Sequence, residues 1–403
     1  MPGILPLAIF VLTYVGMALG RIPGLALDRT GCALLGAVAF LASGEISLAQ
    51  AKQAVDAPTL AVLFGMMILS AQYQLSGLYG AIGERLAATA GPRRLLLLTV
   101  VVSALLAAVL TNDVICFTLT PLLGAALLAG GLDPLPFLLA LACAANIGSA
   151  LTPIGNPQNI LIAQRLGLRF LPFVVACALP VAVGLGVTYL ILARRVPRLP
   201  PAAPEQAPRA AGPPLDRWQA QKAVILTAGA IALFLSPIPA GVTALAIAGV
   251  VLTSRRMHTR DMLALVDWQL LALFCGLFVV NHGLEVSGWT QAGQRWLQGL
   301  GADLSHPLVL VPVVVLLGNF VGNVPAVMLL LPFVPQRHEV GWAIALSSTF
   351  AGNAVLPGSI ANLIVAEQAR RLGLRFGFRE HLRIGLPVTI VSLLAAGLAM
   401  YVW

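Results

Sequence analysis

Long apolar runs follow one another through nearly the whole chain, and polar residues interrupt them at matched places in its two halves. In the first half the interruptions read LTNDV, from Leu110, and NIGSALTPIGNPQN, from Asn146. In the second half they read VGNVP, from Val321, and TFAGNAVLPGSIAN, from Thr349. Because an α-helix needs about 20 apolar residues to cross a bilayer, the runs predict an all-α integral membrane protein. Glycine, proline and asparagine at this density predict that its helices break at these four places.

The apolar runs of the first half predict five crossings, at about residues 4–20, 30–44, 57–76, 134–163 and 170–193. The stretch 94–129, between the third and the fourth crossing, is open to two interpretations. It forms either two short crossings or one re-entrant hairpin with residues 111–113 at its tip. Each arm has about 17 residues, the lower limit for a span, so length does not decide between them.

The second half repeats the pattern of the first, which predicts two related membrane halves. A shift of 211 residues superposes Asp56 on Asp267, Gly65 on Gly276, Asn112 on Asn323 and Pro121 on Pro332. A shift of 203 residues then superposes Gly155 on Gly358 and Asn159 on Asn362. Between the halves, residues 194–220 contain seven prolines and several arginines and cannot bury an apolar face. We therefore expect membrane repeats at 1–193 and 221–403, joined by a solvated, Pro-rich linker.

The distribution of charge predicts how the halves are oriented. If 94–129 and its repeat both re-enter, each half has five crossings, and the second half starts on the opposite side from the first. The positive-inside rule then places the linker in the cytoplasm, because most of the 24 Lys and Arg residues fall on that side. Only Lys52, Arg165, Arg169, Arg295 and Arg337 remain outside. We therefore expect two inverted repeats of five transmembrane helices, each with a re-entrant hairpin and one unwound helix, and both termini outside.

The composition excludes several other classes of protein. With 59% hydrophobic and 10% charged residues and a mean hydropathy of +0.93, the chain is far from the balance of a soluble domain. The net charge of +9 follows from the topology and requires no nucleic-acid partner. The sequence has no GxxxxGKS/T loop, no HExxH or GxSxG motif and no Cys/His set with metal-ligand spacing. It therefore predicts neither an enzyme nor a bound cofactor.

The first interruption places Thr111, Asn112 and Asp113 inside an apolar stretch. A break inside the membrane leaves helix ends whose free N–H groups favour anions and whose free carbonyls favour cations. One interpretation makes the triplet a helix cap at an ordinary turn. The repeat-related Asn323 favours the other, in which the two tips bind a ligand. Asp113 is the one carboxylate near a break, and it either binds a coupling ion or proton or caps the following arm.

The second interruption brings Gly148, Pro153, Gly155 and Pro157 into one span, so the backbone should unwind there. The stretch 349–362 of the second half should do the same. The alternative is a continuous helix that is kinked and packed by its small residues. If the backbone unwinds, neutral amides and hydroxyls face the interior together with helix ends. Such groups suit a small oxyanion with Na⁺ or H⁺ and do not suit a bare divalent metal.

At these four interruptions the chain resembles the ion-transporter superfamily of arsenite permeases, citrate–metal symporters and divalent-anion/Na⁺ symporters. It is most similar to uncharacterised bacterial inner-membrane permeases of the citrate-transporter-like group, through LTNDV, LTPIGNPQNILI and LPGSIANLI. The resemblance implies that the tips and the unwound helices form the substrate site. By position it implicates Thr111, Asn112, Asn146, Ser149, Thr152, Asn156, Asn159, Gly322, Asn323, Thr349, Asn353, Ser359 and Asn362 in substrate binding. It implicates Asp113, Asn112 and Asn323 in binding the coupling ion, and members of the family commonly form homodimers.

We therefore expect a secondary transporter of the cytoplasmic membrane that moves a small anion or oxyanion, such as a carboxylate or arsenite, coupled to H⁺ or Na⁺. Its partners would be the lipid bilayer and this substrate. The tips read Thr-Asn-Asp and Gly-Asn-Val, where dicarboxylate symporters usually show Ser-Asn-Thr. No arginine is expected at the site, which suits a neutral acid such as arsenite. The alternatives are a Na⁺/H⁺ antiporter of the same superfamily, a passive channel and a membrane-embedded enzyme.

Overall fold

The computed structural model describes residues 3–20, 24, 26–89, 91–196, 213–301 and 303–401. Within these residues the regular structure is α-helix with two short 3₁₀ turns, and there is no β-strand. Six of the described helices are long and apolar enough to cross a membrane: α4 (Ala57–Leu75), α6 (Pro92–Val109), α7 (Asn112–Ala129), α10 (Phe170–Ala193), α14 (Trp268–Val286) and α20 (Phe378–Met400). The prediction of an all-α membrane protein is confirmed.

The remaining helices complete the two halves of the chain. The first half also contains α1 (Ile4–Leu19), α2 (Arg29–Ala42), α3 (Leu48–Ala54), α5 (Leu78–Ala87), α8 (Leu135–Ser149) and α9 (Pro157–Leu166). The second half also contains α11 (Arg217–Phe234), α12 (Ala240–Leu252), α13 (Thr259–Ala264), α15 (Trp289–Gly299), α16 (Pro307–Val321), α17 (Asn323–Leu330), η1 (Leu331–Phe333), α18 (His338–Ala351), η2 (Leu356–Gly358) and α19 (Ile360–Arg371). Most of the predicted linker, at 197–212, lies outside the described residues, and α11 already begins within its last four residues.

Two repeat-related aspartates start two of the long helices. The Asp56 carboxylate precedes α4 and accepts a hydrogen bond from the Thr59 backbone N–H at 3.0 Å. The Asp267 carboxylate precedes α14 and accepts one from the Leu270 backbone N–H at 2.8 Å. Each side chain satisfies a donor that the first helical turn leaves open. The same local chemistry therefore starts corresponding helices in both halves.

All four predicted interruptions separate helices. α6 and α7 meet at residues 110–111, and α16 and α17 meet at Gly322. The backbone leaves the α-helical conformation at 150–156, between α8 and α9, and at 352–359, between α18 and α19. The alternative of continuous, kinked helices is therefore wrong at these two places. α6 and α7 each have 18 residues, a length of about 27 Å, so the re-entrant hairpin stays a prediction.

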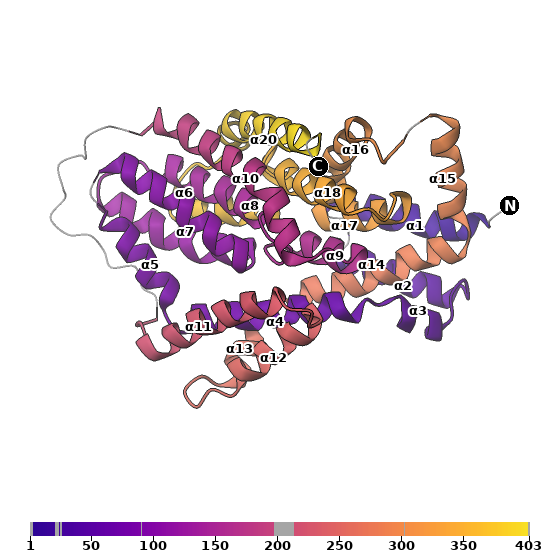
Figure 1. Cartoon of the computed structure of the whole chain (residues 1–403), viewed down its shortest axis with the longest axis horizontal. Helices are drawn as coiled ribbons and strands as arrows, with labels where there is room; N and C mark the ends of the chain where they lie inside the picture. The colour runs from indigo at the N-terminus through magenta and orange to yellow at the C-terminus, as the bar shows by residue number, and fades with distance from the viewer. Residues whose placement is uncertain are drawn as a thin grey trace.

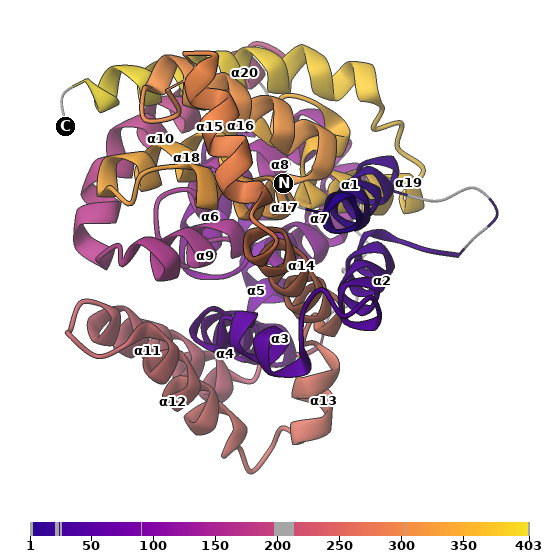
Figure 2. The same ribbon diagram turned by 90° about the vertical axis from the view of Figure 1, so that its right-hand side faces the viewer.

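The two halves interleave in space. α4 packs on α12, α2 on α14, α10 on α20 and α7 on α19, and each pair takes one helix from each half. In Figure 1, α10 and α20 lie next to each other along one edge of the molecule. In Figure 2, α4, α11, α12 and α13 form a group below the larger bundle that holds α6–α10 and α16–α20.

Two close helix contacts relate the halves reciprocally. Gly65 in α4 lies against α12, where an added Cβ would come 2.5 Å from the Ala244 carbonyl oxygen. Gly276 in α14 lies against α2, where an added Cβ would come 2.8 Å from the Ala33 carbonyl carbon. Ala33 and Ala244 are separated by the same 211 residues as the two glycines. Reciprocal contacts of this kind arise from a two-fold relation, so they support the prediction of a repeat.

Candidate functional site

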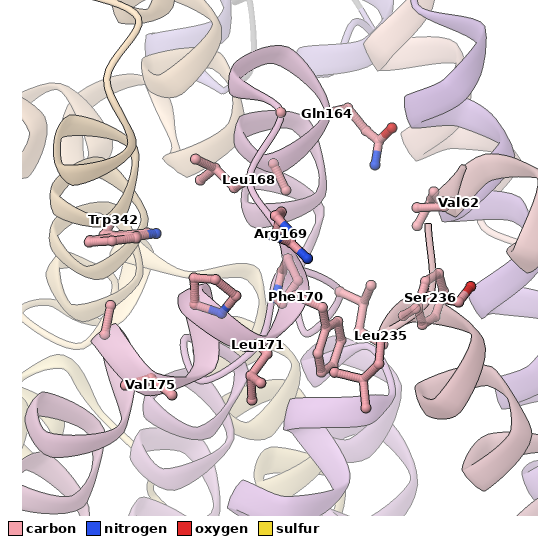
Figure 3. A pocket seen from close by; sticks show the side chains of 18 of the residues that line it. Val62, Gln164, Leu168, Arg169, Phe170, Leu171, Val175, Leu235, Ser236 and Trp342 are labelled. Carbon is pink, nitrogen blue, oxygen red and sulfur yellow. The ribbon is translucent and has the colours of Figure 1, made fainter. Parts of the chain in front are cut away.

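A cavity of about 830 Å³ lies apart from most of the predicted site. It is bounded by the corner between α9 and α10 and the turn between α11 and α12. Figure 3 shows Phe170 and Leu235 on its wall, beside Arg169. Of the first unwound segment it touches only Pro153 and Ile154. Because its wall is mainly apolar and omits the predicted polar residues, this cavity does not suit a small hydrophilic substrate.

Three of the four breaks meet in the interior around Asn146, near the end of α8. The Asn146 Nδ2 donates to the Oδ1 of Asn353 at 2.8 Å and to the Oδ1 of Asn362 at 3.0 Å. Its Oδ1 accepts from the Nδ2 of Asn112 and from the hydroxyl of Ser359, both at 3.0 Å. A side-chain amide offers two donors and two lone pairs, so all four are used. Asn146 therefore ties the breaks of the first half to those of the second.

Side chains of the first unwound segment satisfy the backbone that it opens. Asn156 caps α9 by accepting from the Asn159 N–H at 2.8 Å, and its Nδ2 donates to the hydroxyls of Ser149 at 2.9 Å and Thr349 at 3.2 Å. The Asn159 Nδ2 donates to the carbonyl oxygens of Ser149 and Thr152, at 3.3 and 3.1 Å. The Thr152 hydroxyl donates to a carbonyl oxygen of α6. These side chains provide the hydrogen bonds that lipid cannot provide to an unwound backbone.

The second unwound segment packs against a histidine that the sequence analysis missed. The Asn362 Nδ2 donates to the Gly352 carbonyl oxygen at 2.7 Å. His381 of α20 is fully buried, with its Nε2 2.9 Å from the Asn353 carbonyl oxygen and 3.3 Å from the Asn362 Nδ2. In the sequence His381 stands in REHLR, at the start of a crossing, which is typical of a surface residue. Its burial depends on α20 packing over the second break, which no local pattern indicates.

A small cavity of about 60 Å³ lies where the starts of four helices meet. It is lined by Asn112 and Asp113 of α7, Pro157 of α9, Asn323 of α17 and Ile360 of α19. Helix starts present unpaired N–H groups and the positive end of the helix dipole. In the described chain, no side-chain cap bond satisfies the first turn of α7, α17 or α19. The backbone around the cavity therefore favours an anion.

Several polar side-chain atoms near the cavity make no hydrogen bond in the described part of the chain. Within the residues that the structure describes, the Thr111 hydroxyl and the Oδ1 atoms of Asn112 and Asn323 have no hydrogen-bond partner. Asn112 lines the cavity and is only 6% exposed. Buried polar atoms in proteins are normally paired, so these oxygens are free to bind a ligand or ion.

The structure divides the predicted site residues into two groups. Asn112, Asp113, Gly322, Asn323 and Ser359 line the small cavity. The others are buried and do not line it: Thr111, Asn146, Ser149, Thr152, Asn156, Asn159, Thr349, Asn353 and Asn362. Apart from Thr111, each side chain of the second group makes hydrogen bonds within or between the breaks, and of these Asn159 keeps an Oδ1 that is unpaired within the described residues.

Arg29, the first residue of α2, also lines the cavity, and this corrects the expectation that no arginine stands at the site. Its Nε donates to the Met17 carbonyl oxygen at 3.3 Å. A Cβ added to Gly322 would lie 3.2 Å from its Nη1. No sequence pattern indicated this position, because an arginine at the start of a crossing ordinarily marks the membrane interface. Gln158 is a second polar lining residue that the prediction omitted.

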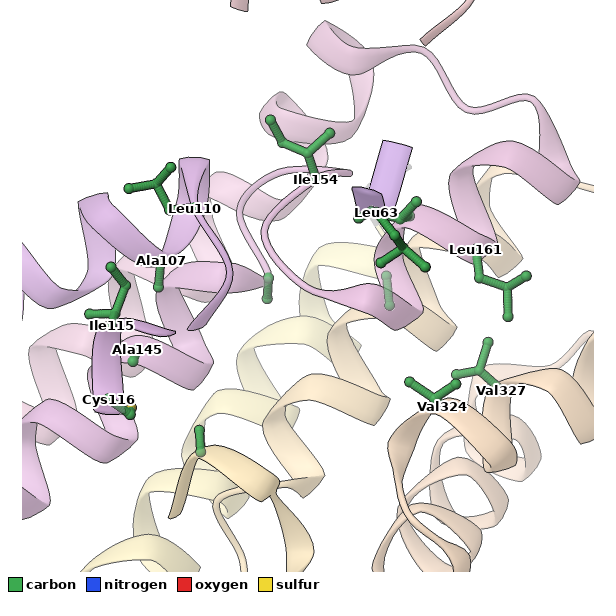
Figure 4. Packing of buried hydrophobic residues seen from close by; sticks show 14 of the residues in the cluster. Leu63, Ala107, Leu110, Ile115, Cys116, Ala145, Ile154, Leu161, Val324 and Val327 are labelled. Atoms are coloured by element: carbon green, nitrogen blue, oxygen red, sulfur yellow. The ribbon is translucent and has the colours of Figure 1, made fainter. Parts of the chain in front are cut away.

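Apolar packing encloses the break between α6 and α7. Figure 4 shows Ala107 of α6, Leu110 at the break, Ile115 and Cys116 of α7, and Ala145 of α8 gathered at this junction. All five residues are fully buried. Non-helical backbone is tolerated at membrane depth only where protein or a wet cavity covers it, and here protein covers one side of the break while the small cavity meets the other.

Helices that break around a buried polar site are typical of membrane transporters, and comparison with known proteins places the chain in this class. The family model described as "Citrate transporter" matches residues 14–341, and the chain therefore belongs to the citrate transporter family. The predicted resemblance is confirmed. The family is one of transporters and not of enzymes.

The relatives extend over most of the chain. The chain is 31% identical to the silicon efflux transporter LSI3 of Oryza sativa subsp. japonica, with 92% of each chain covered. It is 34% identical to the inner membrane protein YbiR of Escherichia coli K12, over 80% of this chain and 83% of that protein. Its fold is similar to that of the YdaH transporter of Alcanivorax borkumensis, with a TM-score of 0.61, 18% identity and coverage of 99% of this chain and 96% of the other. At that identity the last likeness shows the fold alone.

Proposed function

We propose that the protein is a secondary transporter that carries a small anion or oxyanion across the cytoplasmic membrane, coupled to H⁺ or Na⁺. One observation supports the anionic cargo above all others. Four helix starts and the Arg29 guanidinium surround one cavity of about 60 Å³. Partial positive charges at helix starts favour anions without any dedicated basic cluster. The cavity has space for only a few water molecules, which favours a compact oxyanion or a single carboxylate group.

Asp113 is the proposed site of coupling, because it is the carboxylate-bearing residue that lines the same cavity. An anion and a carboxylate at close range repel each other, so they stay together only if a proton or a cation accompanies them. The free Oδ1 atoms of Asn112 and Asn323 are neutral oxygen ligands of the kind that suits Na⁺. The alternative role for Asp113, a helix cap, has less support, because Thr111 occupies the cap position of α7 and Asp113 lies inside its first turn.

Replacing Asp113 with asparagine should uncouple transport while leaving exchange intact. Asparagine keeps the size of the side chain but carries no charge, so it should neither accept the coupling proton nor attract Na⁺. We expect accumulation driven by a Na⁺ or pH gradient to fall at least about tenfold in proteoliposomes. Counterflow of the same substrate, which needs no gradient, should remain. Asp133→Asn is the matched control, because Asp133 is exposed and only accepts from the Leu135 N–H. Gradient-driven uptake that survives in the Asp113→Asn protein would reduce Asp113 to a structural role.

Counterflow in proteoliposomes tests the proposed function itself. The panel is citrate, succinate, sulfate, phosphate and arsenite, each measured with a Na⁺ gradient, with a pH gradient and with neither. Saturable uptake of at least one anion is expected, because a carrier binds its cargo before it moves it. A protein that moves none of them, but collapses a pH gradient when Na⁺ or Li⁺ is added, would be the antiporter instead. Conduction that does not saturate would identify a channel.

We also propose that residues 1–193 and 221–403 are inverted repeats, with the linker in the cytoplasm and both termini outside. The reciprocal contacts of Gly65 and Gly276 support the repeat. Thiol labelling tests the orientation at His306 and Arg256, two exposed residues predicted on opposite sides. In intact cells a membrane-impermeant maleimide should label the His306→Cys protein and should label the Arg256→Cys protein only after permeabilisation. The reverse pattern would invert the proposed orientation.

A further inference from the structure

Arg29 reaches the small cavity from outside the broken helices. It begins α2, which packs mainly on α1 and α14. Its side chain is half-buried, and its one hydrogen bond in the described residues uses only the Nε. The other polar residues of the cavity, by contrast, belong to the tips and unwound segments that the sequence pattern already marks. The positive charge is therefore supplied by a separate element of the fold.

No carboxylate neutralises Arg29 in the part of the chain that the structure describes. None of the ion pairs within 4.0 Å in that part involves it, although Asp113 lines the same cavity. The neighbouring Asp28 is occupied elsewhere. Its Oδ1 accepts from the Gly31 N–H at 2.8 Å, and its Oδ2 accepts from the side-chain amide of Gln269. The charge of the half-buried guanidinium and its remaining N–H donors are therefore available to an anionic ligand.

The second tip is shaped to let this guanidinium approach. Gly322 has a φ of +97°, a conformation that residues with a Cβ rarely adopt. A Cβ at this position would lie 3.2 Å from the Arg29 Nη1, closer than ordinary van der Waals contact. Glycine therefore has two roles at position 322. It allows the sharp break before α17, and it leaves room for Arg29 beside Asn323. The cation and the free N–H groups of α17 consequently face the same small volume.

We infer that Arg29 selects the charge of the cargo, so that the carrier prefers an ionised oxyanion to a neutral acid of the same size. This inference rests on the proposed function. Helix N–H groups and amides bind the oxygens of neutral and ionised acids alike, because both are hydrogen-bond acceptors. A guanidinium adds a charge-assisted hydrogen bond that only the ionised form can fully use. The specificity thus comes from a residue that takes no part in the asparagine network.

Removing the charge tests the inference. In Arg29→Gln, counterflow of sulfate and phosphate should fall by on the order of 10- to 100-fold in kcat/KM, the usual range for loss of a charge-assisted hydrogen bond. Arsenous acid, which is neutral at pH 7, should change by less than about threefold. Arg29→Met retains the apolar stem and should behave like Arg29→Gln. Arg29→Lys keeps the charge but loses the planar fork, so it should retain the preference for anions at lower affinity.

The matched control is Arg256→Gln. Arg256 is exposed, lies away from the cavity and pairs with Asp216 at 3.2 Å, so its loss should leave the ratio between probes unchanged. If Arg29→Gln lowers all probes equally, or leaves sulfate and phosphate unchanged, the inference is overturned while the carrier function stands. If the wild-type protein moves none of the probes, the proposed function fails before any variant is compared. Melting temperatures in detergent identify a variant that has merely unfolded, and the comparison then uses Arg29→Met.

Discussion

Replacing Asn146 with alanine should abolish transport and markedly destabilise the protein. The change removes four buried hydrogen bonds at once and leaves four buried atoms without a partner: the Asn112 Nδ2, the Ser359 hydroxyl and the Oδ1 atoms of Asn353 and Asn362. A buried polar group that loses its partner costs about 1–3 kcal/mol, although polar contacts in membrane proteins tend toward smaller values. We therefore expect a loss on the order of 3 kcal/mol or more, measured as the shift of thermal unfolding in detergent, together with no detectable uptake in proteoliposomes.

Two asparagines provide the comparison for this prediction. Asn281 is half-buried and bonds only to the Tyr14 hydroxyl and the Leu277 carbonyl oxygen, so Asn281→Ala should cost less stability. Asn323 lines the cavity with an unused Oδ1, so Asn323→Ala should impair transport and leave stability nearly unchanged. Equal stability of the Asn146→Ala and Asn281→Ala proteins would show that the four-bond network does not hold the breaks together.

The breaks themselves were predictable from sequence, because their causes are local. Glycine, proline and asparagine within a few positions cannot continue a helix, whatever the rest of the chain does. The caps at Asp56 and Asp267 are equally local, since each bonds an N–H three residues on. The bounds of α4 and α10 agree with the apolar runs at 57–76 and 170–193 for the same reason. Where the hydrophobic pattern was compatible with two arrangements, as at 94–129, two helices of 18 residues leave both open.

Which polar residues line the cavity, and which only hold the breaks in place, was not predictable from the sequence. Asn112 and Asn146 have similar sequence surroundings. Asn112 nevertheless lines the cavity, whereas the side chain of Asn146 is fully used in four hydrogen bonds. Only the packing of α8 against α7 and α19 decides which is which. Arg29 and His381 were missed for a related reason. Each stands at the start of a crossing, where a basic residue is ordinary. Arg29 reaches the site beside Gly322 of the other half, and His381 reaches it by its contact with the Asn353 carbonyl oxygen.

Gly385 in α20 offers the second test of how the breaks are held. A Cβ at this position would collide with the Asn353 carbonyl oxygen and would lie 2.9 Å from the His381 Nε2. Gly385→Ala should therefore push α20 away from the second unwound segment and weaken the hydrogen bond between His381 and Asn353. Overpacking of this kind typically costs about 1–3 kcal/mol. Because Asn353 accepts from Asn146, the displacement should reach the asparagine network, and we expect uptake to fall at least about tenfold.

Gly397 is the control for Gly385, because it lies in the same helix and an added Cβ would meet nothing within 4 Å. Alanine is a better helix former than glycine, so Gly397→Ala should be neutral or stabilise the protein by up to about 1 kcal/mol. Opposite effects of one methyl group at two positions of one helix would show that the contact with Asn353, and not helix propensity, sets the result. Unfolding temperature and proteoliposome uptake of both variants decide the matter. Equal behaviour of the two would mean that α20 does not hold the second break in place.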